Sequence, residues 1–326
     1  MLFSSIPRVR LFDGPTPLHP LPRLGEAWGH PQLYIKRDDL IPLGAGGNKL
    51  RSAEFWLGEA LAQGCDAILV AGGLASNQCR ALAAASSRLG LVCHVLHNDE
   101  KPSSRQGNQL LNHLLGVEQI FLGKISEAER TLALEEHAER LRTAGRHPYI
   151  VGRPAVGAMG YVQAALELHA QAEERNLDIR HLFIAGSMGP TEAGLLWGAA
   201  LLGRAFSLHT PSVEYDTETL MQKIAAICDD LSARFGFAPA VSPLSLLDAG
   251  DNFLGPGYDL MTPEALSAVR ELASLEGIFI ETTYNAKVFA ALKAMIACGV
   301  LPRQEAICIF HTGGFPALFA QAERFA

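Results

Sequence analysis

One lysine stands in a setting that favours covalent chemistry. Residues 44–51 read Gly-Ala-Gly-Gly-Asn-Lys-Leu-Arg, which places Lys49 directly after a glycine-rich stretch. Most lysines are solvated surface charges, but here the glycines leave room for a planar ring, and the apolar positions that follow indicate a helix start. A lysine amine near a buried site has a lowered pKa and can form an imine with a carbonyl group. The stretch therefore predicts an imine-forming nucleophile at Lys49.

Three glycine-containing turns are candidates for binding the anionic part of a ligand. They cover residues 72–78, 185–194 and 311–316, and each follows an expected strand and precedes an expected helix. Backbone N–H groups and the positive end of a helix dipole favour a phosphate at such a turn. The alternative for any one of them is that its glycines merely permit a tight turn.

Two nucleotide-binding motifs are disfavoured at these positions. The spacing of Gly186, Gly189 and Gly194 is not that of GxGxxG, and residues 47–50 lack the spacing and the hydroxyl residue of a P-loop. A single phosphate group is therefore favoured over a dinucleotide or a triphosphate, and a Rossmann-like nucleotide-binding enzyme is a disfavoured alternative.

Short apolar runs alternate with amphipathic segments, as in successive βαβ units. Such runs fit an open, mainly parallel sheet with helices on both faces, in which ligands bind beyond the carboxyl ends of the strands. Helix signals are Ser126 and Thr262 as starts, and Gly64, Gly90 and Gly145 as stops. Strands are expected at residues 67–71, 91–96, 117–122, 148–151, 181–185, 277–280 and 306–310, and a helix at 78–89.

Composition excludes several classes of protein. The chain has 326 residues, 27 Lys+Arg against 34 Asp+Glu, a net charge of −7 and 48% hydrophobic residues. This balance predicts a large buried core and no nucleic-acid partner, and no apolar run is long enough to predict a membrane span. The six cysteines are scattered without a CxxC pair, which disfavours zinc and disulfides. Because residues 1–10 also lack the apolar core of a secretory signal, we expect a cytoplasmic protein.

Several collinear motifs resemble one enzyme family. The motifs at residues 46–51, 76–77, 185–195 and 311–314, with others from Thr16 to Phe319, are similar to those of the D-cysteine desulfhydrase and 1-aminocyclopropane-1-carboxylate (ACC) deaminase family. The resemblance implies the cofactor pyridoxal 5'-phosphate (PLP) and the type II, tryptophan synthase β-like fold, with two open, twisted, mainly parallel α/β domains and the cofactor between them. We expect a large PLP-binding domain from residues 1–49 and 162–326 and a small α/β domain from residues 50–161. By analogy, the family also implies a homodimer.

The resemblance also implies roles for individual residues. Lys49 would hold the cofactor covalently, release it to the substrate amine and then move the α-proton. Tyr258 and Tyr284 match the pair of tyrosines on the substrate side, where a phenol could protonate the leaving group. The catalytic set is Lys49, Ser76, Tyr258 and Tyr284. The cofactor-binding set is Lys49, Asn48, Asn77, Ser187, Met188, Gly189, Pro190, Thr191 and Thr312, and the substrate-binding set is Ser76, Asn77, Gln78, Tyr258 and Tyr284.

Three departures from the family pattern bear on activity. Gln78 replaces the histidine usual after Ser-Asn, and Met188 and Pro190 stand in the phosphate turn, where proline removes an N–H donor. Asn285 follows Tyr284, where ACC deaminases carry a glutamate. An acidic partner would keep the pyridine nitrogen protonated, so a neutral residue argues against the harder ring opening.

The expected reaction is therefore α,β-elimination from a small β-substituted amino acid. D-cysteine, giving pyruvate, ammonia and sulfide, is the leading substrate. The alternatives are a related deaminase, sulfo-lyase or β-replacement enzyme acting on ACC, cysteate or another β-substituted amino acid, and a catalytically silent PLP-binding protein. Substrate chirality and leaving group stay open at this point.

Overall fold

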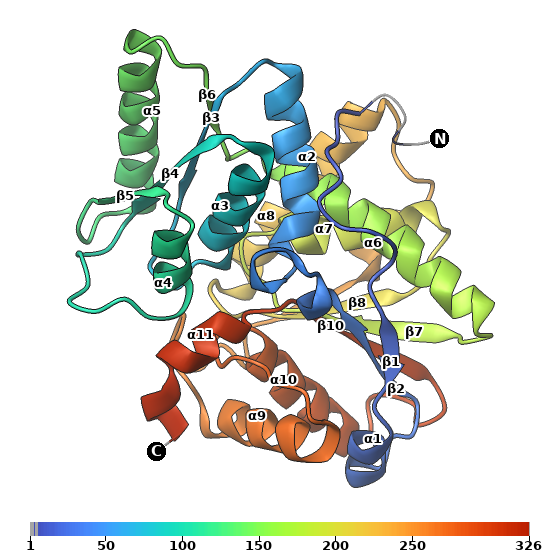
Figure 1. Ribbon diagram of the computed structural model, residues 1–326. Coiled ribbons are helices and arrows are strands. Elements are labelled where there is room, and N and C mark those ends of the chain that lie inside the picture. The colour runs from blue at the N-terminus through green and yellow to red at the C-terminus, as the bar shows by residue number, and fades with distance from the viewer. Residues whose placement is uncertain (1–2, 4–5, 326) are drawn as a thin grey trace.

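Two β-sheets of unequal size organise the chain (Figure 1). The structure is a computed structural model that describes residue 3 and residues 6–325. Of residues 1–10, for which no secretory signal is expected, residues 1–2 and 4–5 lie outside this described part. No helix in the described part is both long and apolar enough to span a membrane.

The larger sheet has six strands, which come from residues 18–37 and 179–311. Their order is β1-β2-β10-β7-β8-β9; β1 pairs antiparallel with β2, and the other neighbours are parallel. The mainly parallel order needs helical crossovers, which cover both faces. The strands are β1 (Leu18–Pro20), β2 (Leu33–Arg37), β7 (Ile179–Phe183), β8 (Ser207–Pro211), β9 (Leu247–Gly250) and β10 (Ala306–His311).

The smaller sheet is entirely parallel, with four strands in the order β5-β4-β3-β6. All of its strands fall between residues 67 and 150. The domain boundaries at residues 49/50 and 161/162 stay a prediction. The strands are β3 (Ala67–Ala71), β4 (Val92–His97), β5 (Glu118–Phe121) and β6 (Pro148–Ile150).

The helices lie in layers around the sheets. In Figure 1, α6 and α7 lie above the six-stranded sheet, α9 and α10 lie below it, and α5 lies on the outer side of the small sheet. The helices are α1 (Pro22–Trp28), α2 (Lys49–Ala62), α3 (Asn77–Leu89), α4 (Gly107–Leu114), α5 (Glu127–Thr143), α6 (Pro154–Glu174), α7 (Pro190–Leu201), α8 (Thr217–Phe235), α9 (Pro263–Glu276), α10 (Asn285–Ala297) and α11 (Phe315–Ala320).

Alternate side chains of the central strands belong to different cores. Cys308 and Phe310 of β10 point into the largest cluster, whereas Ile307 and Ile309 point into the cluster with α9 and α10. This period of two is what a strand buried on both faces requires. The largest cluster continues through α2, α3, α6 and α7 to β3 in the small sheet, so one core joins the two sheets.

Glycines allow α2, α6 and α7 to pack closely. A Cβ on Gly160 of α6 would lie 2.3 Å from the Arg51 carbonyl oxygen of α2, and one on Gly194 of α7 would lie 2.2 Å from the Ala158 carbonyl oxygen of α6. Any larger residue would force these helices apart. The close contact fixes α2, which begins at Lys49, against the rest of the fold.

Local helix signals are confirmed. Ser126 begins α5 with a capping box to Glu129, and Thr262 begins α9 by accepting the Ala265 N–H. Gly90 ends α3 in the left-handed conformation. Left-handed glycines also follow α2 at Gly64 and α5 at Gly145.

The strand expected at residues 277–280 is wrong. The segment buries Ile278 and Ile280, as a strand would, but it forms no strand in the structure. The Phe279 carbonyl oxygen contacts the His311 ring nitrogen at 3.0 Å instead of a backbone N–H group of a neighbouring strand. The other expected strands and the helix at 78–89 are confirmed, with ends shifted by one or two residues.

Candidate active site

Lys49 lies at the first position of α2, immediately after a glycine turn. Gly46 and Gly47 have φ values of 69° and 107°, and a Cβ on Gly46 would lie 2.2 Å from the Asp39 carbonyl oxygen. Only glycine fits this conformation without strain. The side chain of Lys49 is half-buried. Burial lowers the pKa of the Lys49 amine, although the charges of Glu192 and Glu214 act to raise it, and a lowered pKa increases the fraction of neutral, nucleophilic amine.

The turns after β7 and β10 meet the segment that carries Lys49. The Asn48 N–H donates to the Thr312 carbonyl oxygen at 3.0 Å, and the Asn48 side-chain amide donates to Thr191 Oγ1 at 3.3 Å. A Cβ on Gly313 would lie 2.6 Å from Gly47 Cα. Two of the three predicted turns therefore lie against Lys49, at the carboxyl ends of the strands.

The turn at residues 72–78 joins the same region through a buried guanidinium. Ser76 caps α3 by accepting the Cys79 N–H at 3.2 Å, and Asn77 Oδ1 accepts from Asn108 at 2.9 Å. Arg80 donates to Asn108 Oδ1 at 2.7 Å and to the Gly46 carbonyl oxygen at 3.0 Å. This chain of hydrogen bonds ties the turn to the glycines before Lys49. Gln78 lies half-buried on the first turn of α3.

The predicted phosphate turn leads into α7. Gly189 is the N-cap residue with φ 100°, Pro190 is the first helical residue, and Thr191 is 4% exposed. Met188 is 40% exposed, and its sulfur accepts a hydrogen bond from the Tyr215 hydroxyl at 3.2 Å. A helix N-terminus favours an anion in general, and Pro190 would contribute no N–H to one at this turn.

The Ser187 donors of this turn contact two carboxylates. The Ser187 N–H donates to Glu192 Oε1 at 2.6 Å. The Ser187 hydroxyl donates to Glu214 Oε2. The predicted phosphate turn therefore holds two acidic side chains of the chain itself.

Thr312 is linked to α10 through Asn285. Asn285 Oδ1 accepts from the Thr312 N–H at 3.1 Å and from the Thr312 hydroxyl at 3.2 Å. Its amide nitrogen donates to Glu281 at 3.0 Å and to the Gly313 carbonyl oxygen at 2.9 Å. Burial raises the pKa of Glu281, although hydrogen bonds from residues 283–285 act to lower it. A neutral amide thus stands between Thr312 and the carboxyl group.

Tyr258 and Tyr284 form a pair on the adjoining loops. Their hydroxyl oxygens are 2.5 Å apart, and the ring planes are inclined by 72°. Lys287 of α10 donates to the carbonyl oxygens of Leu254 at 2.7 Å and Gly257 at 3.0 Å. The buried ammonium group therefore holds the Tyr258 loop on the helix that follows Tyr284.

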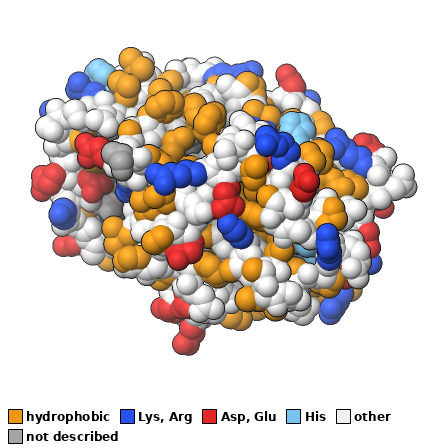
Figure 2. Space-filling model, turned by 90° about the horizontal axis from the view of Figure 1, so that it is seen from below, with side chains coloured by type: hydrophobic (Ala, Val, Ile, Leu, Met, Phe, Trp, Pro, Cys, Tyr) orange, Lys and Arg blue, Asp and Glu red, His pale blue; other side chains and the backbone are white. Residues whose placement is uncertain are grey.

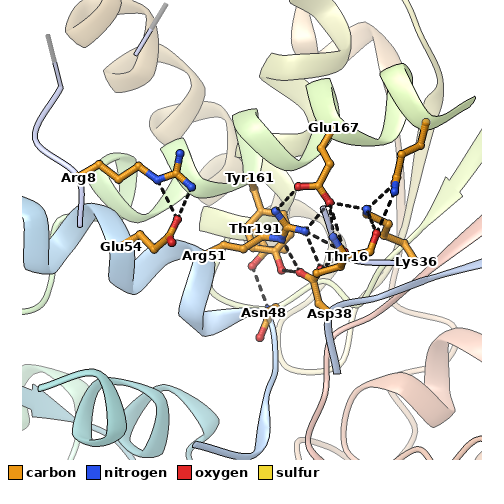
Figure 3. Close-up of polar contacts among 11 residues, drawn as sticks. Arg8, Thr16, Lys36, Asp38, Asn48, Arg51, Glu54, Tyr161, Glu167 and Thr191 are labelled. Carbon is orange, nitrogen blue, oxygen red and sulfur yellow. Dashed lines mark hydrogen bonds and ion pairs between the residues drawn. The ribbon is translucent and has the colours of Figure 1, made fainter. Parts of the chain in front are cut away.

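A buried ionic network around Asp38, Arg51 and Glu167 (Figure 3) stabilises the segment that precedes Lys49. Arg51 Nε donates to Asp38 Oδ2 at 2.8 Å, and Arg51 also donates to both Glu167 oxygens at 2.9 Å. The Tyr161 hydroxyl donates to Asp38 Oδ2 at 2.9 Å. Because the Asp38 carbonyl oxygen accepts the Gly47 N–H at 3.0 Å, the network fixes the backbone just before Lys49.

Five residues of this region carry no local sequence signal for a role in the site. Arg80 and Lys287 look like ordinary helix cations in the sequence, and their burial depends on tertiary contacts. Glu214 follows β8, whose Ser-Leu-His-Thr-Pro sequence is too polar to predict a strand. Its position after a strand would have been the signal for a site residue. The five residues are Arg80, Glu192, Glu214, Glu281 and Lys287.

Comparisons with known proteins agree with this arrangement. The family model described as "Pyridoxal-phosphate dependent enzyme" matches residues 9–313. D-cysteine desulfhydrase of Yersinia enterocolitica is 35% identical, covering 97% of this chain and 96% of the relative, and that of Salmonella newport is 33% identical, covering 97% of each. The crystal structure of an ACC deaminase homologue has a TM-score of 0.91 at 30% identity, covering 99% of this chain and 97% of that one. O-ureido-L-serine synthase shares the fold, with a TM-score of 0.68 at 18% identity over 97% and 92% of the two chains.

The fold, the family match and the solved relative define a PLP enzyme of fold type II. The chain belongs to the pyridoxal-phosphate dependent enzyme family, and within it to the group of D-cysteine desulfhydrase and ACC deaminase. It is a PLP-dependent lyase of this group.

The residues present fit the cofactor. A Cβ on Gly313 would lie 2.6 Å from Gly47 Cα, so only glycines let the turn that carries Thr312 lie directly beside the start of α2 and Lys49. Lys49 would bind the aldehyde carbon, Thr312 would face the ring nitrogen, and the N-terminus of α7 would take the phosphate. Bound PLP supplies the electron sink that stabilises negative charge on the substrate Cα.

Proposed function

We propose that the chain catalyses α,β-elimination from a small amino acid with a β-leaving group, with D-cysteine as the leading substrate. The products would be pyruvate, ammonia and hydrogen sulfide, with one water consumed. The D-cysteine desulfhydrases at 33–35% identity support this substrate class. The observation that carries the proposal is the hydrogen bond between Tyr258 and Tyr284. The residue after Tyr284 is the neutral Asn285, which accepts a hydrogen bond from Thr312.

Lys49 is the base that we assign to the α-proton. Burial lowers its pKa, so a larger share of the amine is neutral and able to accept a proton from the substrate Cα. The same amine can later return a proton. Its position at the start of α2, fixed by the Gly47 and Asp38 hydrogen bond, gives it a defined direction of approach.

The tyrosine pair is the acid that we assign to the leaving group. Burial raises the pKa of Tyr284, and the neighbouring Tyr258 raises it further, so both phenols are protonated at neutral pH. A neutral phenol can donate a proton to the departing sulfur as the Cβ–S bond breaks, so that the sulfur leaves as hydrosulfide or hydrogen sulfide and not as a sulfide dianion.

The first turn of α3 is the site that we assign to the substrate carboxylate. Ser76 is the N-cap residue, and Asn77 and Gln78 are the first two helical residues. N–H groups at a helix start and the helix dipole both favour a carboxylate. The Asn108 and Arg80 hydrogen bonds hold this turn in place.

The neutral environment of Thr312 favours elimination over ring opening. Asn285 accepts the Thr312 hydrogen bonds with its carbonyl oxygen. A carboxylate at that position would hold a proton on a ring nitrogen and strengthen the electron sink. Without one, breaking the weaker bond to a β-leaving group is the easier reaction, and for this reason we rank ACC below D-cysteine.

A substrate panel tests the proposal. PLP-loaded protein is incubated with the D and L forms of cysteine and cysteate and with ACC, while pyruvate, 2-oxobutyrate, sulfide and sulfite are measured. We expect pyruvate and sulfide from D-cysteine. If 2-oxobutyrate from ACC were the main product, the chain would be an ACC deaminase. If sulfite from cysteate were the main product, it would be a sulfo-lyase. A bound cofactor with no product and no exchange of the α-proton in D₂O would identify a silent PLP-binding protein.

We also propose that the chain is a homodimer. Phe315 contacts Phe279 in a tilted arrangement and Phe319 edge-on, with ring centroids 6.1 and 5.1 Å away, and all three residues are at least 40% exposed. Figure 2 shows apolar side chains interspersed with charged ones on the lower face of the molecule. Light scattering of wild type and of Phe319→Ser tests this, since a dimer through the aromatic cluster should weaken in the variant.

A further inference from the structure

Ser187 of the phosphate turn is already engaged by two carboxylates. Its N–H donates to Glu192 Oε1 at 2.6 Å, and its hydroxyl donates to Glu214 Oε2. These are the backbone and side-chain donors that a phosphate at the start of α7 would use. Pro190, in the same turn, has no N–H to offer.

Glu192 puts a carboxylate at the helix start from within α7. It is the third residue of the helix and is 2% exposed. A glutamate at this position reaches back to the N–H groups before the helix, as in a capping box. Burial raises the pKa of Glu192, whereas the Ser187 amide and the charge of Lys49 act to lower it.

Glu214 reaches the same serine from the segment after β8. The Val213 N–H donates to the Gly186 carbonyl oxygen at 2.9 Å, and the Gly186 N–H donates to the Pro211 carbonyl oxygen at 2.9 Å. These backbone bonds hold the segment against the phosphate turn. Glu214 is half-buried, and it belongs to a different element from Glu192, so the two carboxylates approach Ser187 independently.

We propose that Glu192 and Glu214 compete with the phosphate of PLP for Ser187, so that this chain holds its cofactor mainly through Lys49 and the ring contacts. A phosphate carries about two negative charges at neutral pH, and like charges a few ångströms apart in a partly buried site repel strongly. Binding then requires the carboxylates to move away or to take up protons. The expected consequence is ready exchange of the cofactor with free PLP. This inference concerns cofactor retention and holds for any amino-acid substrate.

Binding of two aldehydes to charge-neutralised variants tests the proposal. Glu214→Gln and Glu192→Gln are compared with wild type, with PLP and with pyridoxal, which lacks the phosphate. Affinity is followed by quenching of tryptophan fluorescence and by visible absorbance. Removing one charge should tighten PLP binding about tenfold and change pyridoxal binding much less. Inorganic phosphate should also compete with PLP at lower concentrations in both variants.

The controls separate this effect from charge in general and from misfolding. Glu218→Gln removes an exposed charge four residues from Glu214, and it should bind both aldehydes as wild type does. If buried Glu192→Gln fails to fold, as judged by its thermal melt, the half-buried Glu214→Gln still decides the matter. Unchanged or weaker PLP binding in Glu214→Gln, or an equal gain for PLP and pyridoxal, would overturn the proposal while leaving the reaction untouched.

Discussion

The hydroxyl groups of Tyr258 and Tyr284 lie 2.5 Å apart and share one hydrogen bond. Although 43% of Tyr258 is exposed, burial of the rest raises its pKa to about 12, with the Tyr284 hydrogen bond acting in the opposite direction. One phenol must donate to the other, so a single O–H hydrogen of the pair is free for the substrate. The pair can therefore act as one acid.

The tyrosine pair should matter most for poor leaving groups. We expect Tyr284→Phe to lower kcat for D-cysteine about 100-fold, the lower end for general acid catalysis. The loss should be much smaller for β-chloro-D-alanine, because chloride leaves without a proton. Steady-state assays of pyruvate with both substrates measure the difference, and Tyr34→Phe, remote from the pair in sequence, is the control. Equal losses for the two substrates would contradict a proton-donating role.

Lys49 should be needed for both the bound cofactor's colour and turnover. In Lys49→Ala, the absorption band of the lysine-linked cofactor should vanish, and pyruvate formation should fall about 10⁴-fold. Absorbance spectra and borohydride trapping followed by peptide mapping check this. Lys124→Ala, at an exposed position, should keep both properties. A pyridoxyl group found on another lysine of the wild type would refute the assignment.

Asn285→Asp should destabilise the chain in a pH-dependent way. The new carboxylate would face Glu281, which now accepts the Asn285 amide at 3.0 Å, and a buried pair of like charges costs about 3 kcal/mol or more. Since burial already raises the pKa of Glu281, a proton shared by the two groups relieves the repulsion as the pH falls. Urea unfolding should show a smaller loss at pH 5.5 than at pH 8, whereas exposed Asn252→Asp should show no loss at either pH.

Glu167 should stabilise the fold down to acidic pH. Burial alone would raise its pKa, but Arg51 and Lys36 lower it from 4.5 to about 2. A carboxylate with a depressed folded-state pKa contributes stability above pH 4.5, and that stability is lost as the pH falls toward 2. The shift corresponds to about 3 kcal/mol. In denaturant titrations at pH 7, the free energy of unfolding of Glu167→Gln should be lower than that of wild type by this amount, and the difference should be smaller at pH 3. Exposed Glu174→Gln should have the same stability as wild type.

Lys287 should determine the order of the Tyr258 loop. Lys287→Met leaves the Leu254 and Gly257 carbonyl oxygens without their donor, which costs about 1.5–3 kcal/mol for hydrogen bonds to a charged group. We expect faster proteolysis within residues 251–261 and a raised KM for D-cysteine. Lys293→Met, which removes a 44% exposed side chain from the same helix, serves as the control. Unchanged cleavage of the loop would show that other contacts hold it.

Local and periodic signals in the sequence predicted much of the fold. Apolar runs such as residues 67–71 and 306–310 became central strands, and the caps at Ser126 and Thr262 began helices. The strands β1, β2, β8 and β9 were not expected, and two of them carry buried charged or polar side chains. In β2, Lys36 is fully buried because Glu167 of α6 pairs with it, and in β8, His209 contacts Asp248 of β9 at 2.7 Å. Such partners are distant in sequence, so no local sequence pattern predicts these pairs.

The candidate site likewise contains some residues that local sequence signals predict and others whose roles depend on tertiary contacts. Lys49 and the three turns follow from glycine spacing and strand ends, and the structure places those turns side by side. The acidic groups at Ser187 come from two different elements, and the roles of Arg80 and Glu281 depend on burial. The roles of such charged groups can be inferred only once the order of the strands in the sheet is known, because their electrostatic effect depends on distance and on exclusion of solvent.

The apolar interior that runs from β10 through α2, α6 and α7 to β3 has a consequence for how the chain can move. A hinge needs a plane with few contacts, whereas α2, α6 and α7 pack against one another at glycines within this shared interior. We therefore expect opening and closing around the cofactor to come from peripheral pieces, such as the segment with Tyr258 and the α4 region. Hydrogen exchange should accordingly find a single slow-exchanging unit spanning both sheets, with early exchange confined to those edges.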